Sequence, residues 1–282
     1  MKLAVFYPQN ISCAWSLQDG LCDTLERMGH EVARCGIAER LKRPRDLNAF
    51  DALVVSGPEH IGNTLRAQKD WESAKAPKIG WMHESVRRED YGTLDVGAIK
   101  RTCDQVFCPA SEDEEFGFEY LPFGVDTEMF REDPDYGDTG SYGPARDIDL
   151  AFIGMVYHKR QAYLNTLPAE FRAKLTIGNC LVQDLHGPNI RKSMELYAET
   201  LCRIKVFYML PALSRLTVTK IYEAKACGAV LATSPEQAEV LLANDVQREL
   251  ASRANAEKTI KEDSLEKRCE VLLSHVSAGV AA

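Results

Sequence analysis

The chain of 282 residues is 45% hydrophobic and 27% charged, a balance typical of a globular protein that buries its own core. Its 18 glycines and 12 prolines are too few for a collagen-like or wholly disordered chain. No apolar run of about 20 residues predicts a membrane span, and MKLAVFYPQN at the amino end is too short for a secretory signal, so we expect a cytoplasmic protein.

Charge is distributed unevenly along the chain. Residues 1–140 carry 16 Lys and Arg against 26 Asp and Glu, a net charge of −10, whereas residues 141–282 carry 18 against 16, a net charge of +2. Nucleic acid binding usually needs a basic surface, which the first half lacks. The mildly basic second half would suit a small phosphate ligand, although chance surface composition explains the same split.

The first half of the chain alternates apolar runs with helical patterns. Leu17, Leu21 and Leu25 recur at helical spacing, and Gly29 is placed to end that helix in a left-handed conformation. Strands separated by helices of this length favour parallel βαβ units and one doubly wound domain over residues 1–133. We expect its strands at 1–7, 31–36, 51–57, 78–82 and 105–110, with helices at 16–28, 62–75 and 94–102.

A polar segment then separates the two halves. Residues 112–138 contain eleven acids and one arginine, and DPDYGDTGSYGPAR at 133–146 is rich in turn-forming residues. We interpret residues 133–146 as a loop or linker and place the domain boundary there.

A second alternating run follows from residue 147. We expect its strands at 147–154, 174–179, 205–210 and 229–234, its helices at 158–171, 193–203 and 217–227, and a helical tail from about 236 with breaks near Asn244 and at 254–263. The chain is therefore predicted to be α/β, with two tandem Rossmann-like domains, 1–133 and 147–282, facing a cleft that is the default ligand site.

Two segments of the second domain suggest a phosphate site. GMVYHKR places Gly154 at a strand end, followed by the cations Lys159 and Arg160, which would attract a diphosphate; a solvated basic turn is the plainer alternative. The second is the helix around Lys220.

In that helix, Thr217 or Thr219 could cap the amino end, where free N–H groups favour an anion. Lys220 in the first turn opposes the helix dipole unless an anion lies there. Glu223 follows one turn later, where it could accept bonds from sugar hydroxyls. Gly228 is placed to end the helix in a left-handed conformation before the next strand. An ordinary amphipathic helix is the alternative.

Candidate acid–base groups lie in the first domain. His83 and Glu84 follow the strand at 78–82 and either could act as a general base, although a capped loop is the commoner explanation; His60 is a weaker candidate. The loop at 8–16 lacks a dinucleotide fingerprint and is either a substrate-facing loop or a connector.

Four stretches of the sequence carry a family resemblance: LCDTLERMGHEV (21–32), LPFGVDTEMF (121–130), DIDLAFIGMVYHKR (147–160) and KIYEAKACGAVLATS (220–234). In this order they resemble GT-B glycosyltransferases, and are similar to glycosyltransferase family four and its CgeB-like branch. The resemblance implies a glycosyltransferase that moves a hexose or pentose, with retention, from a nucleotide-diphosphate sugar to an acceptor hydroxyl.

The resemblance also implies roles for individual residues. The donor would bind the second domain, with Glu223 on its ribose, Arg160 or Lys159 on its pyrophosphate and Lys220 assisting. No metal and no cofactor beyond the nucleotide-sugar co-substrate would be needed. The tail beyond about 265 would return to the first domain or pack on its own.

Two other functions stay open. One is transfer of sugar to a modified DNA base, which the acidic first half opposes. The other is a non-catalytic nucleotide-sugar binding module, because Arg215 stands where family four usually has an acid.

Overall fold

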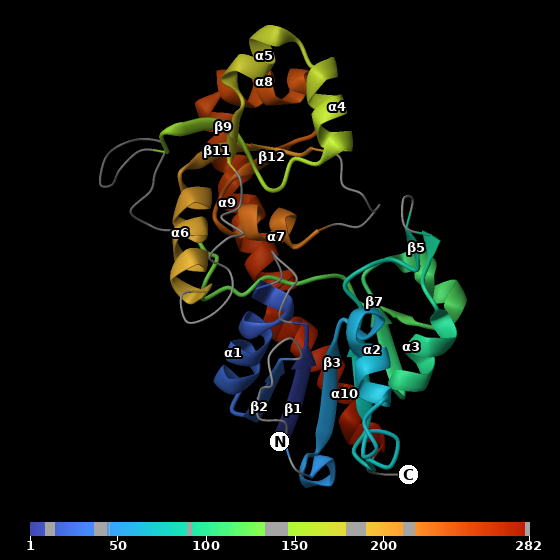
Figure 1. Cartoon of the computed structure of the whole chain (residues 1–282). Coiled ribbons are helices and arrows are strands. Elements are labelled where there is room, and N and C mark those ends of the chain that lie inside the picture. The colour runs from blue at the N-terminus through green and yellow to red at the C-terminus, as the bar shows by residue number, and fades with distance from the viewer. Residues whose placement is uncertain are drawn as a thin grey trace. The chain divides into compact units, whose positions relative to one another are not determined.

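The protein folds into two compact units, each built around its own sheet (Figure 1). The computed structural model describes residues 1–8, 15–36, 44, 46–88, 92–132, 146–178, 190–210 and 218–279. The first unit comprises the described residues of Met1–Gly124 and of Leu265–Ala282. The second comprises those of Val125–Ala212 and of Val218–Ser264. The first division therefore falls after Gly124, before residues 133–146, which the sequence predicts to be a loop or linker.

The first unit contains a six-stranded parallel sheet in the order β2-β1-β3-β4-β7-β8. Strands β3 and β4 are buried along their whole length, as expected of parallel strands covered on both faces. The strands are β1 (Lys2–Tyr7), β2 (Glu31–Gly36), β3 (Ala52–Ser56), β4 (Lys78–Trp81), β7 (Gln105–Cys108) and β8 (Glu119–Tyr120), with a small hairpin of β5 (Arg87–Arg88) and β6 (Gly92–Thr93).

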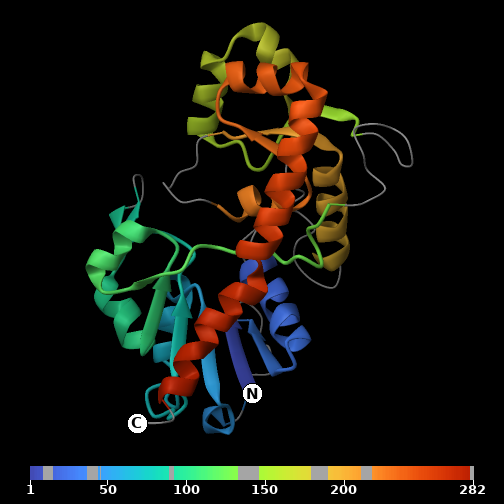
Figure 2. The ribbon, with the colours of Figure 1, turned by 180° about the vertical axis from the view of Figure 1, so that it is seen from behind.

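Helices cover both faces of this sheet. On one face Ala4 and Phe6 join the main core, where the Phe6 ring meets Trp71 edge to face at 5.2 Å. Because side chains alternate along a strand, Leu3 and Val5 point to the other face. Figure 2 shows α10 crossing that face, where α1 packs against it. The helices of this unit are α1 (Asp19–Arg27), α2 (Pro58–Arg66), α3 (Val96–Thr102) and α10 (Leu265–Gly279).

The second unit contains a four-stranded parallel sheet in the order β10-β9-β11-β12. Aromatic rings fill its core: Phe152 lies 6.1 Å from Phe207, and Phe171 lies 5.1 Å from Tyr208. Its strands are β9 (Ile148–Ile153), β10 (Thr176–Gly178), β11 (Ile204–Tyr208) and β12 (Val230–Ala232), and its helices are α4 (His158–Thr166), α5 (Ala169–Lys174), α6 (Ile190–Cys202), α7 (Thr219–Ala226), α8 (Pro235–Ala243) and α9 (Asp245–Glu262).

A buried arginine forms hydrogen bonds to three separate segments beside the second sheet. Arg146 is 3% exposed and donates to the carbonyls of Ile204 at 3.0 Å and Cys227 at 3.2 Å, and to the carboxylate of Glu132 at 3.1 Å. Its guanidinium occupies the space that a Cβ on Gly228 would fill. Gly228 is therefore required both for this approach and for its left-handed conformation, φ +80°, which the sequence predicts.

The alternation of strands and helices is confirmed, with differences at element ends. The helix expected at 158–171 is two helices, because Pro168 cannot continue the first and instead caps α5. The tail breaks at Asn244 as expected. The second break falls only at the end of the range predicted for it, 254–263, since α9 runs unbroken to Glu262, is capped by Asp263 and is followed by α10 from Leu265. The helix expected at 62–75 is α2, which starts at Pro58, a favoured first residue.

Two further features concern the helices and the cysteines. None of the helices in the described part of the chain is long and apolar enough to cross a membrane. All seven cysteines that the structure describes are buried.

Candidate functional site

Strand β9 ends at the residues that the sequence singles out for phosphate. Gly154 follows β9 and donates its N–H to the carbonyl of Gly178 at 2.8 Å. The Lys220 ammonium donates to the carbonyl of Ile153 at 3.1 Å and fills the place that a Cβ on Gly154 would take. The missing side chain of Gly154 therefore lets the cation of α7 reach the carboxyl end of β9, where ligands bind in open parallel sheets.

A second cation, Arg160, lies at the same strand end. The Arg160 guanidinium lies 4.9 Å from the centroid of the Phe152 ring and 4.6 Å from that of Tyr157, and it donates to the carbonyl of Met155 at 2.7 Å. The Lys220 ammonium is 5.9 Å from the same Phe152 ring. Stacking on aromatic faces holds a guanidinium in place.

Helix α7 contains Lys220 and Glu223, as the sequence predicts, but the predicted cap is wrong. It begins at Thr219, with Val218 as its N-cap and no capping bond from a side chain, so capping by Thr219 is wrong; Thr217 lies outside the described residues. Glu223 is only 2% exposed, and its Oε2 accepts a hydrogen bond from the Tyr197 hydroxyl at 3.1 Å.

The other residues singled out in the sequence contribute less to the geometry. Lys159 is the second residue of α4 and is partly exposed. Arg215, like Asn10 and Ser12 of the amino-terminal loop, lies outside the described residues, whereas Trp15 is 4% exposed and buried.

The carboxyl ends of β3 and β4 carry a different chemistry in the first unit. The His83 ring is 9% exposed, and its Nε2 lies 2.7 Å from Ser56 Oγ. The Ser56 hydroxyl donates its only proton to the carbonyl of Leu17. Ser56 must therefore accept from His83, so the proton sits on Nε2 and Nδ1 carries the lone pair. Burial lowers the pKa of His83 to about 3, so the ring is neutral.

Glu59, from the first turn of α2, completes this cluster. Its side chain is 0% exposed, and its Oε1 accepts from the backbone N–H groups of His83 at 2.6 Å and Glu84 at 3.1 Å. The imidazole of His60 lies beside it, with Nε2 3.5 Å from Glu59 Oε1 and 3.9 Å from Glu84 Oε1. Burial raises the pKa of Glu59 to about 8.

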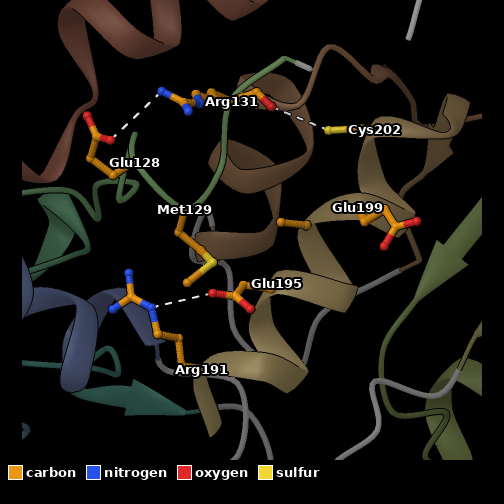
Figure 3. A pocket seen from close by; sticks show the side chains of 8 residues that line it. Glu128, Met129, Arg131, Arg191, Glu195, Glu199 and Cys202 are labelled. Atoms are coloured by element: carbon orange, nitrogen blue, oxygen red, sulfur yellow. Dashed lines mark hydrogen bonds and ion pairs between the residues drawn. The ribbon is translucent and has the colours of Figure 1, made fainter. Parts of the chain in front are cut away.

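The second unit also contains a surface hollow of about 320 Å³ between α6 and the chain before β9 (Figure 3). Its arginines are each close to an acid: Arg131 is 3.8 Å from Glu128, and Arg191 is 3.5 Å from Glu195. Glu199 adds a further negative charge to the lining. Three acids against two arginines do not favour a diphosphate, so this hollow does not compete with the phosphate site predicted from the sequence at Gly154.

Comparison with known proteins identifies the fold but no close relative. No protein-family model and no curated protein matches the sequence. One similar solved structure is an α-glucosyltransferase in complex with UDP-glucose and DNA containing an abasic site, with a TM-score of 0.58 and 10% identity over 98% of this chain and 99% of that one. Another is AviGT4, a glycosyltransferase involved in avilamycin A biosynthesis, with a TM-score of 0.52 and 12% identity over 100% and 98%.

A third similar structure is a putative UDP-N-acetylglucosamine 2-epimerase from Listeria monocytogenes, with a TM-score of 0.52 and 10% identity over 100% of this chain and 97% of that one. At such identities the likeness shows the fold alone. The chain has two Rossmann-like domains of the GT-B type, as the sequence predicts. The resemblance to glycosyltransferase family four and its CgeB-like branch stays a prediction.

The structure brings together Gly154, Arg160 and Lys220, and it also adds residues that sequence reasoning missed. Phe152 and Tyr157 support Arg160, and both are visible in the sequence as aromatics flanking the Gly154 turn. Ser56 and Glu59 had no signal, because their partners come from separate strands and loops.

Proposed function

We propose that the protein is a glycosyltransferase that moves a sugar from a nucleotide-diphosphate sugar to an acceptor hydroxyl, with the donor held by the second unit. One observation carries this proposal: Lys220 and Arg160 converge on one ring, Phe152, at the carboxyl end of β9. Two cations beside a side-chain-free Gly154 form a site for a compact, doubly charged group.

The same cations supply the chemistry of the leaving group. As the glycosidic bond to the donor breaks, negative charge develops on the departing diphosphate, and positive groups already in place stabilise it. Lys220 also lies in the first turn of α7, whose N–H groups add to the positive potential. We propose that Arg160 and Lys220 replace a metal ion in this role, with Lys159 as the alternative to Arg160.

Glu223 is the proposed ribose ligand. A carboxylate can accept hydrogen bonds from two neighbouring hydroxyls, and the Tyr197 hydroxyl fixes the orientation of this one. Gly154 and Thr219 would lie against the nucleotide through their backbones. For the acceptor, we propose His83 or Glu84 as the base in the first unit, because both follow β4 at the carboxyl end of the sheet.

A second candidate function is transfer to a base in DNA. It is favoured by the α-glucosyltransferase that was solved with DNA and that matches 98% of this chain. The net charge of −10 over residues 1–140 opposes it, because a polyanion needs cationic contacts.

The proposal is tested with the purified full chain and a panel of nucleotides. Thermal unfolding is measured with UDP, GDP, ADP and dTDP, since a ligand at 100 times its Kd adds about 2.7 kcal/mol to the free energy of unfolding. The corresponding nucleotide-sugars are then incubated with small alcohols, sugars and duplex DNA, and release of nucleoside diphosphate is measured.

We expect one diphosphate to stabilise the protein and its sugar to release diphosphate when an acceptor is present. Release with DNA alone, falling steeply with salt, would establish the second candidate. Binding without release would support a binding module, and change of the donor sugar without transfer would indicate an epimerase. No stabilisation and no release with any donor would overturn the proposal.

A further inference from the structure

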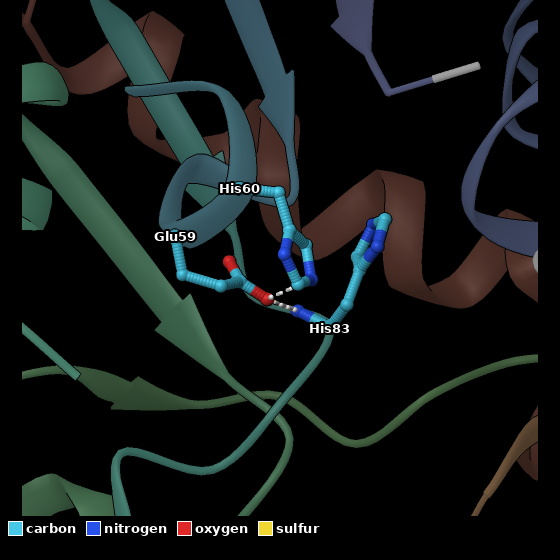
Figure 4. A group of neighbouring side chains, drawn as sticks. All are labelled: Glu59, His60 and His83. Atoms are coloured by element: carbon cyan, nitrogen blue, oxygen red, sulfur yellow. Dashed lines mark hydrogen bonds and ion pairs between the residues drawn. The ribbon is translucent and has the colours of Figure 1, made fainter. Parts of the chain in front are cut away.

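We propose that Glu59, His60 and His83 form a binding site for a divalent transition-metal ion of the zinc type in the first unit. One nitrogen from each imidazole and one carboxylate oxygen of Glu59 lie within 4.8 Å of one another. Figure 4 shows these side chains approaching from α2 and from the end of β4. Two imidazoles and a carboxylate are a ligand set that zinc takes at sites with an open fourth position.

Two buried atoms in this cluster need a positively charged or donating partner. Among the described residues, His83 Nδ1 and Glu59 Oε2 are buried without any hydrogen-bond partner. Nδ1 can only accept, because Ser56 fixes the ring proton on Nε2. A buried acceptor left unsatisfied costs about 1–3 kcal/mol. A cation bound by His83 Nδ1 satisfies that atom, and the Glu59 carboxylate would contribute one oxygen to the same ion.

The surroundings of these atoms are those of a metal ligand. A histidine that binds a metal usually donates its other N–H to an oxygen, which orients the ring. Here His83 does so to Ser56, and the chain of bonds continues to Leu17. Glu59 is held in the same way, since its Oε1 accepts two backbone N–H groups.

A glycine leaves the space between the two imidazoles open. Gly57 has φ +76°, and a Cβ there would lie 3.1 Å from His83 Nδ1 and 3.3 Å from His60 Cδ2. The two rings are 5.9 Å apart, centroid to centroid, at an angle of 56°. Ligand atoms of a tetrahedral zinc ion are about 3.4 Å apart, from bonds of about 2.0–2.1 Å. His60 Nε2 and Glu59 Oε1 are already 3.5 Å apart, so closure requires only that the remaining pairs of ligand atoms, which lie within 4.8 Å, approach by up to about 1.4 Å.

Electrostatics make the carboxylate necessary. The amino end of α2 repels a cation, and Glu59 in its first turn opposes that repulsion once metal binding has displaced its proton. Glu84 adds negative charge on the outer side, 3.9 Å from His60 Nε2. Three ligands from the first unit alone leave the fourth position for water or for a hydroxyl of a bound molecule.

The test uses the untagged full chain, stripped with a chelator and titrated with CoCl₂ while visible absorption is recorded. We expect one cobalt ion per chain, an intense tetrahedral spectrum, no thiolate-to-cobalt charge-transfer band, and displacement by Zn²⁺. His60→Gln and the isosteric Glu59→Gln should each weaken cobalt binding at least tenfold. His158→Gln, which removes an exposed histidine of the second unit, is the matched control and should not change it.

Circular dichroism shows whether each variant keeps its fold, and Glu59→Gln retains an oxygen for the backbone N–H groups of His83 and Glu84. Binding that needs a thiolate band, binding unaffected by His60→Gln, or a weak octahedral spectrum only would overturn the inference. The measurement involves no nucleotide or sugar, so its result is independent of the proposed transferase activity.

Discussion

The two units place opposite chemistries at the same position of the same architecture. In each, side chains gather where parallel strands end, the common ligand edge of such sheets. At the end of β9 the groups are donors and cations, Lys220 and Arg160 over Phe152. At the ends of β3 and β4 they are acceptors, His83 Nδ1 and the carboxylate of Glu59. The fold thus determines where a ligand binds, and the side chains determine its charge.

We call Lys220 and Arg160 at the end of β9 the cationic edge, and His83 and Glu59 at the ends of β3 and β4 the acceptor edge. The two edges also differ in how their groups are held. The cations are supported by ring faces and by single carbonyls, such as those of Ile153 and Met155. The acceptors are fixed by buried hydrogen bonds, in which Ser56 orients His83. Cations held in place by rings and carbonyls can stabilise charge that develops during a reaction, whereas a lone pair fixed by a buried hydrogen bond suits a ligand of defined geometry.

The largest expected effect tests the cationic edge. Lys220→Met should lower the turnover number by about 10²–10³, the loss typical for one group that stabilises a developing negative charge. Rates are measured with the best donor from the panel.

The matched control for this variant is Lys205→Met. Lys205 pairs with Asp149 at 2.6 Å at the amino ends of β11 and β9, so it changes the charge equally without touching the carboxyl edge. Equal rates for both variants would contradict the role of Lys220. Cobalt binding should be unchanged in Lys220→Met, because the three proposed metal ligands all belong to the first unit.

An intermediate effect tests the acceptor edge. Ser56→Ala removes the oxygen that receives His83 Nε2–H, so the ring proton and orientation are no longer fixed. Loss of such a partner typically lowers metal affinity by about 10–100-fold, measured by cobalt titration. Ser73→Ala, which removes an exposed serine of the same unit, serves as the control. Unaltered affinity in Ser56→Ala would show that Ser56 does not position the ring.

The smallest effect concerns the proposed ribose ligand. Tyr197→Phe removes the hydroxyl that donates to Glu223 Oε2. A hydrogen bond of this kind contributes about 1.5–3 kcal/mol when one partner is charged, and part of that would remain through other contacts. We expect the Kd for nucleoside diphosphate to rise about three- to tenfold, measured by thermal shift at graded ligand concentrations.

Tyr120→Phe, at an exposed tyrosine of the first unit, should leave that Kd unchanged. A Kd that Tyr197→Phe does not alter would separate Glu223 from the nucleotide.

The cationic edge could be foreseen because its signals are local. A glycine ends a buried strand, basic residues follow, and a lysine lies in the first turn of a later helix, each readable without its neighbours. The rule that parallel strands end at one edge then predicts that Gly154 and Lys220 meet. The helix cap was misread, since Val218 and not Thr219 precedes the first turn.

The sequence by itself determined the alternation of strands and helices, because burial leaves a periodic pattern on strands and helices. It also indicated the left-handed glycines at 29 and 228 and the cations that follow β9 and begin α7. Only the tertiary structure decided which proton state and which partners the polar groups of the first unit take. His83 owes its tautomer to Ser56 and to the carbonyl of Leu17, which come from other parts of the chain. Hydrogen bonds act over about 3 Å, so they depend on contacts that no local pattern records.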